Sequence, residues 1–324
     1  MDFLFVLQSF RESAGGIFTA FFQKMTLFGE LNTTLVLLAI IYWCIDKKTG
    51  KFLMTGWCWN RLLNGFLKIT ACVYRPWILD SRIVPDQTAL ATATGYSFPS
   101  GHCVNSGSVF GGIALKKDTK TSLRVLCLIS LLLVAFSRLY LCVHTPADVI
   151  VGAVCALLIM WFCRIVLQKT ESKQNADIVI AAISIVISIA IAFYAQFKSY
   201  PVDYDKEGKI LVEGIKMASD CFKGVGWSLG YFVGAVLEKR YVNFSSDGTV
   251  QQRAIRLVGG LLGFYFVNLI LCSIIKLFIT GTLATIVTNF FVMLYITLIF
   301  PYFIKTGQAA SGVGDQNRSG ILPG

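Results

Sequence analysis

Residues 123–143 have the sequence LRVLCLISLLLVAFSRLYLCV, an apolar run interrupted by only two arginines. A helix needs about 20 such residues to cross the hydrocarbon core of a bilayer. Similar runs recur along nearly the whole chain and predict about nine spans. They fall at residues 31–45, 52–74, 101–115, 123–143, 149–167, 178–197, 221–237, 257–277 and 283–304. We therefore expect an all-α, multi-pass transmembrane helical bundle.

The composition excludes a soluble globular protein. Of the 324 residues, 55% are hydrophobic and 15% are charged, whereas soluble domains carry about 25% charged residues. The net charge of +11 fits anionic lipid head groups or phosphorylated substrates better than nucleic acid, because no basic stripe with stacking aromatic residues is present. The ten cysteines are scattered and form no C-x-x-C pair. They predict small buried apolar side chains rather than disulfides or a zinc site.

Basic residues in the predicted loops indicate how the spans are oriented. Lysines and arginines gather at residues 47–51, 116–124 and 164–173, and such clusters face the cytoplasm in membrane proteins. The loops at residues 75–99 and 143–147 then face the opposite side. Both histidines of the chain lie beside these two loops, which places the chemically interesting residues at one membrane face.

His102 closes the string Pro99-Ser100-Gly101-His102 at the start of a predicted span. The free N–H groups at a helix N-terminus favour an anion, and Gly101 lets the backbone approach a ligand closely. An ordinary helix start would also account for most of this string. The string alone is therefore only a moderately specific sign of a site.

His144 lies six residues after Arg138 and four residues before Asp148. If a helix begins here, the i, i+4 spacing places His144 and Asp148 on one face. Asp148 can then accept an imidazole N–H, fix the tautomer and raise the nucleophilicity of the ring. A purely structural pair at a helix start is the alternative.

Lys68 and Arg75 provide two more cations at the end of a span that faces the same side as Arg138. Each cation alone would be expected to extend toward the interface. Three fixed cations beside two histidines and a helix N-terminus, however, suit a phosphate group, and arginine offers it paired donors.

Three motifs of the chain, taken in order, resemble the signature of the type-2 phosphatidic acid phosphatase superfamily. They are K-x6-R-P (68–76), P-S-G-H (99–102) and S-R-x5-H-x3-D (137–148). These membrane lipid phosphate phosphatases are related to vanadium-dependent haloperoxidases. All eleven specified positions are present, and the resemblance covers about residues 31–167. Each motif alone is weak, but the three together are highly specific.

The resemblance implies a role for each motif residue. The residues implied to bind the substrate phosphate are Lys68, Arg75, Arg138, Ser100 and Gly101.

The implied catalytic residues are His144, His102 and Asp148. His144 would be the nucleophile that forms a phosphohistidine, and Asp148 would orient it. His102 would protonate the leaving alkoxide and later activate water. This scheme requires no metal and no other cofactor.

These residues predict a metal-independent phosphatase that removes a phosphomonoester or diphosphate group from a membrane lipid. The candidate substrates are phosphatidate, phosphatidylglycerophosphate and isoprenyl diphosphate. A phosphotransferase using the same site, or a transporter or binding scaffold, is the alternative. We expect a bacterial plasma membrane with the site on its external face, although a lumenal site in the endoplasmic reticulum would give a similar sequence.

The expected organisation has four parts. Residues 1–30 are expected to form an interfacial helix or a first span, and residues 31–169 the six-span phosphatase-like core. Residues 170–306 are expected to form an extension of three or four further spans with unknown role. Residues 307–324 are expected to form a disordered tail. Within the extension, a stripe of glycines permits close helix packing. The stripe, Gly226, Gly230 and Gly234, can face another helix of this chain or a second protomer of a homodimer.

Overall fold

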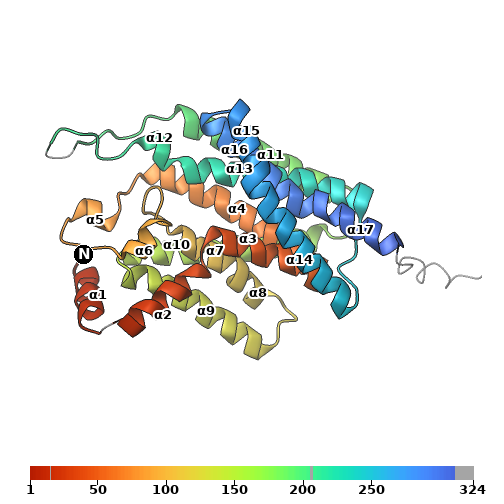
Figure 1. The fold of residues 1–324 in the computed structure, drawn as a ribbon, viewed down its shortest axis with the longest axis horizontal. Helices are drawn as coiled ribbons and strands as arrows, with labels where there is room; N and C mark the ends of the chain where they lie inside the picture. Colours follow the sequence, from red (N-terminus) through yellow and green to blue (C-terminus); the bar gives the residue numbers. More distant parts are fainter. Residues whose placement is uncertain (15, 205–206, 311–324) are drawn as a thin grey trace, which may run out of the picture.

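A computed structural model describes residues 1–14, 16–204 and 207–310. Within these ranges the chain forms helices and no β-strand. The α-helices are α1 (Asp2–Ser13), α2 (Gly16–Leu27), α3 (Leu31–Ile40), α4 (Lys47–Ala71), α5 (Pro76–Leu79), α6 (Gln87–Leu90), α7 (Gly101–Ser106), α8 (Gly112–Leu115), α9 (Thr121–Tyr140), α10 (Pro146–Thr170), α11 (Ala176–Phe197), α12 (Gly214–Met217), α13 (Ser219–Leu237), α14 (Val250–Phe266), α15 (Cys272–Phe278), α16 (Gly281–Leu294) and α17 (Phe300–Ala310) (Figure 1). Five π-helical segments continue them: η1 (Ile41–Ile45), η2 (Gly107–Gly111), η3 (Glu238–Val242), η4 (Val267–Leu271) and η5 (Tyr295–Ile299).

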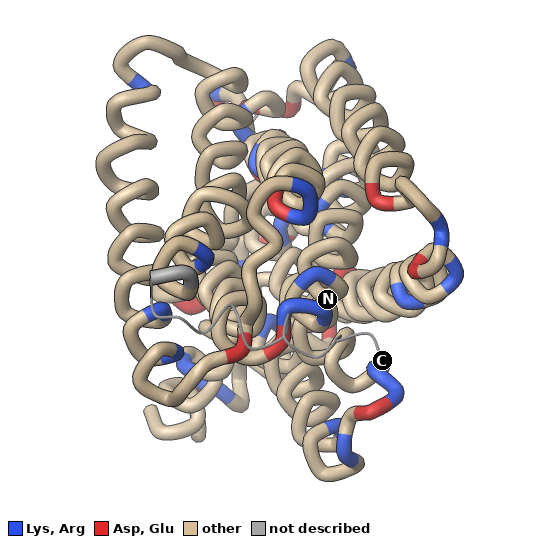
Figure 2. The backbone as a smooth tube through the Cα atoms, turned by 90° about the vertical axis from the view of Figure 1, so that its right-hand side faces the viewer, with Lys and Arg blue, Asp and Glu red and all other residues tan. Residues whose placement is uncertain are grey.

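Each predicted span coincides with a helix or with consecutive helices. Within the described ranges, five helices are long and apolar enough to cross a membrane: Thr121–Tyr140, Pro146–Thr170, Ala176–Phe197, Val250–Phe278 and Gly281–Gln308. Figure 2 shows that charged residues gather mainly at helix ends and connections. The protein is therefore a multi-pass membrane protein with an all-α fold.

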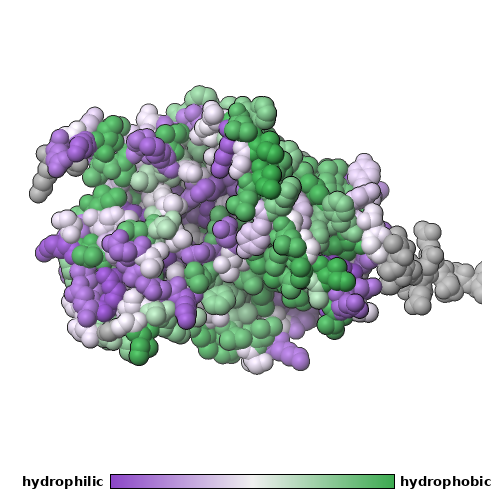
Figure 3. Space-filling view, in the orientation of Figure 1, coloured by the Kyte–Doolittle hydropathy of each residue, from purple (hydrophilic) through white to green (hydrophobic). Residues whose placement is uncertain are grey.

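Helix α4 is at the centre of the bundle and is more polar than the outer helices. It packs against α7, α10, α11 and α13 and buries Asn60, Arg61 and Asn64. Because protein rather than lipid surrounds α4, these polar side chains meet other side chains. Exposed apolar residues such as Leu132 and Leu269 lie on the outer helices. Hydrophobic side chains accordingly cover the middle of the molecule, and hydrophilic ones gather at its left-hand end (Figure 3).

The N-terminal segment forms two short helices, α1 and α2, that both pack against α9. Each has 12 residues and is about 18 Å long, which is shorter than the roughly 30 Å hydrocarbon core. Helix α2 and the following segment Leu31–Ile45 form a pair bent by 54° that is apolar enough for a broken span. At the other terminus, α17 extends to Ala310, so the predicted tail begins inside this helix, and its residues 311–324 lie outside the described ranges.

The C-terminal extension is packed onto the core. Helix α13 lies against both α4 and α11, and the buried Glu238 binds Lys47 at 2.6 Å and Lys51 at 3.0 Å. The predicted glycine stripe of α13 faces α16 of the same chain. A Cβ atom on Gly226 or Gly230 would collide with main-chain oxygens of α16, so these glycines allow the two helices to approach closely.

We expect Gly230→Ala to lower the stability of the fold. The added methyl group would displace the α16 backbone at Phe290, and overpacking of this kind costs about 1–3 kcal/mol. Gly259→Ala is the matched control, because nothing lies within 4 Å of its Cβ position, and alanine is a better helix former than glycine. The measurement is the thermal unfolding midpoint in detergent micelles. Equal midpoints for the Gly230 variant and the parent would contradict the α13–α16 packing.

Candidate active site

A cavity of about 330 Å³ lies where α4 ends and where α7 and α10 begin. Its lining contains the predicted site residues Lys68, Arg75, Gly101, His102 and His144. The other three, Ser100, Arg138 and Asp148, are fully buried behind this lining. The structure thus brings residues from all three motifs to one end of the bundle.

The start of α10 fixes the position of His144 and Asp148. Thr145 caps the helix, and Asp148 Oδ2 accepts the Thr145 N–H at 2.7 Å in a capping box. The same oxygen accepts the Ser97 hydroxyl at 2.6 Å and lies 3.3 Å from His144 Nδ1. The predicted contact between His144 and Asp148 is therefore present, but α10 begins at Pro146, so the capping box and not a shared helical face brings the two together. Ser97 is an additional partner that the sequence did not indicate.

Arg75 defines the tautomer of His144. Its Nη1 donates to His144 Nε2 at 2.9 Å. Because a guanidinium only donates hydrogen bonds, Nε2 must carry the lone pair, and Nδ1 carries the proton that faces Asp148. Arg75 is itself held by main-chain oxygens of Thr94 at 2.7 Å and Gly95 at 3.1 Å. Gly95 has a φ of +68°, a left-handed conformation that favours glycine.

The surroundings keep the His144 imidazole neutral. Burial lowers the pKa of His144 well below its ordinary value, and the nearby charges of Arg75, Arg138 and Lys68 lower it further. His144 therefore keeps an unprotonated Nε2 at neutral pH, which nucleophilic attack requires.

Four cations with little exposure surround this site: Lys68, Arg75, Arg138 and Arg61. In the described part of the chain, no carboxylate oxygen lies within 4.0 Å of their nitrogens. Lys68 donates to the Tyr96 main-chain oxygen at 2.5 Å, and Arg138 donates to the Thr26 hydroxyl at 2.6 Å. Glu30 and Asp220 also line the cavity, but neither forms an ion pair with these four cations, so the cations favour an anion in the cavity.

Several polar atoms beside the cavity are buried without a partner among the described residues. They are Arg138 Nε and Nη2, Ser100 Oγ, His102 Nε2 and Arg61 Nε. Buried polar atoms normally have partners, so this group indicates a place for a polar ligand. Ser100 is the N-cap residue of α7 but does not cap it with its side chain, which leaves its hydroxyl available.

The structure adds residues that sequence reasoning missed. Arg61 lies on α4 two helical turns before Lys68, and it lines the cavity together with Asp220 and Lys223 of α13. An arginine inside an apolar span signals a functional position and could have been noted. Asp220 could not, because residues 198–220 had the composition of a solvated loop, whereas Asp220 belongs to the first turn of α13.

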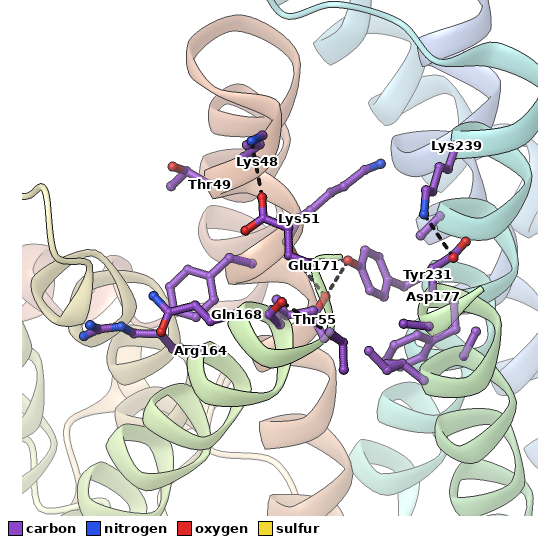
Figure 4. Close-up of a pocket in the computed structure, with 18 of the residues that line it drawn as sticks. Lys48, Thr49, Lys51, Thr55, Arg164, Gln168, Glu171, Asp177, Tyr231 and Lys239 are labelled. Carbon is purple, nitrogen blue, oxygen red and sulfur yellow. Dashed lines mark hydrogen bonds and ion pairs between the residues drawn. The ribbon is translucent and has the colours of Figure 1, made fainter. Parts of the chain in front are cut away.

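A second cavity, of about 770 Å³, lies at the opposite end of α4 (Figure 4). It gathers residues from all three basic loops, including Lys48, Lys116 and Arg164, so these loops share one end of the bundle as expected. Several of its cations already have acidic partners, such as Lys48 with Glu171 at 3.5 Å. Both histidines of the chain lie at the other end, so the smaller cavity is the candidate active site.

Comparison with known proteins relates two parts of the chain to one superfamily. Residues 51–172 match the PAP2 superfamily model, and residues 222–311 match the model described as PAP2 superfamily phosphatase, transmembrane extension. Phosphatidylglycerophosphatase B of Bacillus subtilis (strain 168) is 34% identical over 114 residues, which cover 32% of this chain and 51% of that protein. The chain thus spans about half the length of this curated relative. No solved structure gives a significant match.

The two family models match separate parts of the chain and together take in well over half of it. The first contains the three motifs, and the second begins two residues after Asp220 and contains most of α13 and the helices that follow. The extension that the motifs alone left unexplained is therefore itself a known feature of this group of proteins. The chain belongs to the type-2 phosphatidic acid phosphatase (PAP2) superfamily.

Proposed function

We propose that this protein is a metal-independent lipid phosphatase that hydrolyses a phosphomonoester or diphosphate of a membrane lipid. The observation that carries the proposal is the group of buried cations without carboxylate partners around a cavity that also holds both histidines. Membership of the PAP2 superfamily supports it, as does the name of the Bacillus subtilis relative. Phosphatidate, phosphatidylglycerophosphate and isoprenyl diphosphate are the candidate substrates.

The phosphoryl group is bound by cations and backbone donors in this proposal. Lys68, Arg75 and Arg138 neutralise its oxygens, and the Ser100 hydroxyl and the Gly101 N–H donate to them. Such preorganised donors stabilise the charge of a phosphoryl transition state in the way that metal ions do in other enzymes.

The first chemical step forms a phosphohistidine. Arg75 exchanges its hydrogen bond to His144 Nε2 for one to a phosphoryl oxygen, and the freed lone pair attacks phosphorus. The bond from phosphorus to the leaving oxygen breaks, and the leaving oxygen takes the electron pair. His102, which takes up a proton when the phosphate anion binds beside it, gives that proton to the leaving oxygen, so the lipid leaves as a neutral alcohol. Asp148 stabilises the positive charge on the His144 ring.

The second step returns the enzyme to its starting state. His102, now neutral, accepts a proton from a water molecule as the water oxygen attacks phosphorus. The bond from phosphorus to Nε2 breaks, and its electron pair returns to His144. Inorganic phosphate leaves, and His102 is again protonated for the next turnover.

We propose that the site faces the outside of a bacterial plasma membrane. The three basic loops lie at the end of the bundle opposite to the site, and such loops usually remain in the cytoplasm. The lipid head group then enters the cavity at the external interface while its chain stays in the bilayer.

Phosphate release from detergent-purified protein tests this function. We expect release from at least one lipid in a panel of phosphatidate, phosphatidylglycerophosphate, isoprenyl diphosphate and sphingoid phosphates. Release should persist in EDTA, because protein cations bind the phosphate, and vanadate should inhibit it as an analogue of the phosphoryl group. Label that appears on an acceptor lipid instead of inorganic phosphate would indicate a phosphotransferase. The absence of turnover with every lipid would contradict the proposal and favour a transporter or scaffold.

A further inference from the structure

Arg61 has a position in the cavity that the three motifs do not explain. It is only 4% exposed, it lines the cavity, and its Nε has no hydrogen-bond partner among the described residues. Its Nη1 lies against the start of α7, since a Cβ atom on Gly101 would be 3.4 Å from it. The guanidinium is therefore beside the proposed phosphate site.

The acidic residue nearest in the fold does not neutralise Arg61 by direct contact. The Asp220 carboxylate accepts Thr94 Oγ1 at 3.0 Å and Lys223 Nζ at 3.2 Å. Arg61 reaches only the Asp220 main-chain oxygen, at 3.5 Å. The guanidinium lies 5.5 Å from the ring centre of Trp227 on α13, a contact that holds it in place but leaves its charge available to a ligand.

Arg61 lies on the leaving-group side of the proposed reaction. It precedes Lys68 by seven residues, about 10 Å along α4, in the direction of the bundle interior. His102, the proposed proton donor to the leaving oxygen, follows Gly101 at the start of α7, and Arg61 Nη1 lies beside Gly101. An ordinary alkyl leaving group would place no negative charge beside Arg61.

We propose that Arg61 binds a second phosphate group located on the leaving-group side of the phosphate that is cleaved. This inference rests on the proposed function and narrows its substrate class to lipids with two phosphates. In a diphosphate, His144 Nε2 attacks the terminal phosphorus and the bond to the bridging oxygen breaks. The electron pair stays on the lipid monophosphate, whose added negative charge Arg61 stabilises. In a glycerol-linked bisphosphate, Arg61 binds the phosphodiester instead.

Matched pairs of substrates test this assignment. One pair is an isoprenyl diphosphate and the monophosphate of the same chain, which differ only in the second phosphate. The other pair is phosphatidylglycerophosphate and phosphatidate, which differ in the second phosphate and in the glycerol that carries it. We expect Arg61→Gln to lower kcat/KM for the bisphosphate member by about 10- to 100-fold more than for the monophosphate member. A larger difference in kcat/KM loss within the isoprenyl pair indicates that the second phosphate is linked directly to the first. A larger difference within the other pair indicates that glycerol separates the two phosphates. Arg61→Lys keeps the charge and should recover part of the loss.

Equal losses of kcat/KM for both members of both pairs would overturn the assignment. A residue that only stabilises the fold or binds the cleaved phosphate would affect both members of a pair alike. Arg164→Gln is the control, since Arg164 lines the cavity at the other end of the bundle and should leave both ratios unchanged. If Arg61→Gln cannot be purified, the same ratios measured with Arg61→Lys decide the question.

A binding measurement separates this inference from the proposed function. If the parent protein hydrolyses none of the lipids, the proposed function fails. Titration calorimetry with methylenediphosphonate and with inorganic phosphate then tests Arg61 alone. We expect Arg61→Gln to weaken diphosphonate binding at least about tenfold more than phosphate binding. An equal effect on the two ligands would overturn the assignment.

Discussion

His144→Ala is expected to abolish lipid phosphate hydrolysis, with a loss of kcat of about 10⁴-fold or more. The variant lacks the Nε2 atom that, in the proposed mechanism, bonds to phosphorus. Neither neighbour can replace it, because Arg75 holds no free electron pair and Asp148 Oδ2 is engaged by the Ser97 hydroxyl and the Thr145 N–H. The measurement is the initial rate of phosphate release by the purified variant in detergent, with EDTA present.

The control for this variant is a test that it remains correctly folded. Among the described residues, the His144 side chain bonds to Arg75, Ser97 and Asp148, so its replacement should leave the far-UV circular dichroism and the elution volume unchanged. Retention of more than a tenth of the parent rate by a well-folded variant would exclude His144 as the nucleophile.

His102→Asn is expected to reduce kcat/KM for a lipid alkyl phosphate by about 10²- to 10⁴-fold, the usual contribution of a general acid. The loss of kcat/KM should be below about tenfold for p-nitrophenyl phosphate, because its leaving phenolate is stable without a proton and kcat/KM does not include the later attack of water on the phosphohistidine. The buried His102 Nε2 has no partner among the described residues and lies at the cavity wall, as a proton donor to the leaving oxygen must.

The comparison of the two substrates distinguishes a proton donor from a structural residue. His144→Ala should lose activity toward both substrates, whereas His102→Asn should lose it mainly toward the alkyl ester. Equal losses of the His102 variant on both substrates would contradict the general-acid assignment and leave His102 with a role in phosphate binding or packing.

The helical fold and the residues around the cavity could largely be predicted from the sequence. The apolar runs located the helices because each must be long enough for the bilayer. The contact between His144 and Asp148 was predicted, although His144 precedes α10 and does not share a helical face with Asp148. The start of α4 was missed by five residues. Its first turn is polar, and the helix begins there because Asp46 accepts the N–H groups of Lys48 and Thr49.

Residues brought to the site by tertiary packing could not be predicted. Thr26 of α2 reaches Arg138, 112 residues away, and Asp220 of α13 accepts the hydroxyl of Thr94 beside the backbone that holds Arg75. No local pattern in the sequence encodes these contacts, because they depend on how the N-terminal helices and the extension pack onto the core. The extension is consequently part of the cavity wall and not a separate bundle.

The most direct test of the phosphohistidine mechanism is to trap the covalent intermediate on His144. Protein mixed with a substrate labelled in the cleaved phosphate is quenched within milliseconds in alkali, digested and separated into peptides. We expect an acid-labile, alkali-stable label on the peptide that contains His144, and no label in His144→Ala. Rapid phosphate release with no label on that peptide, or with label on another residue, would contradict the phosphohistidine mechanism.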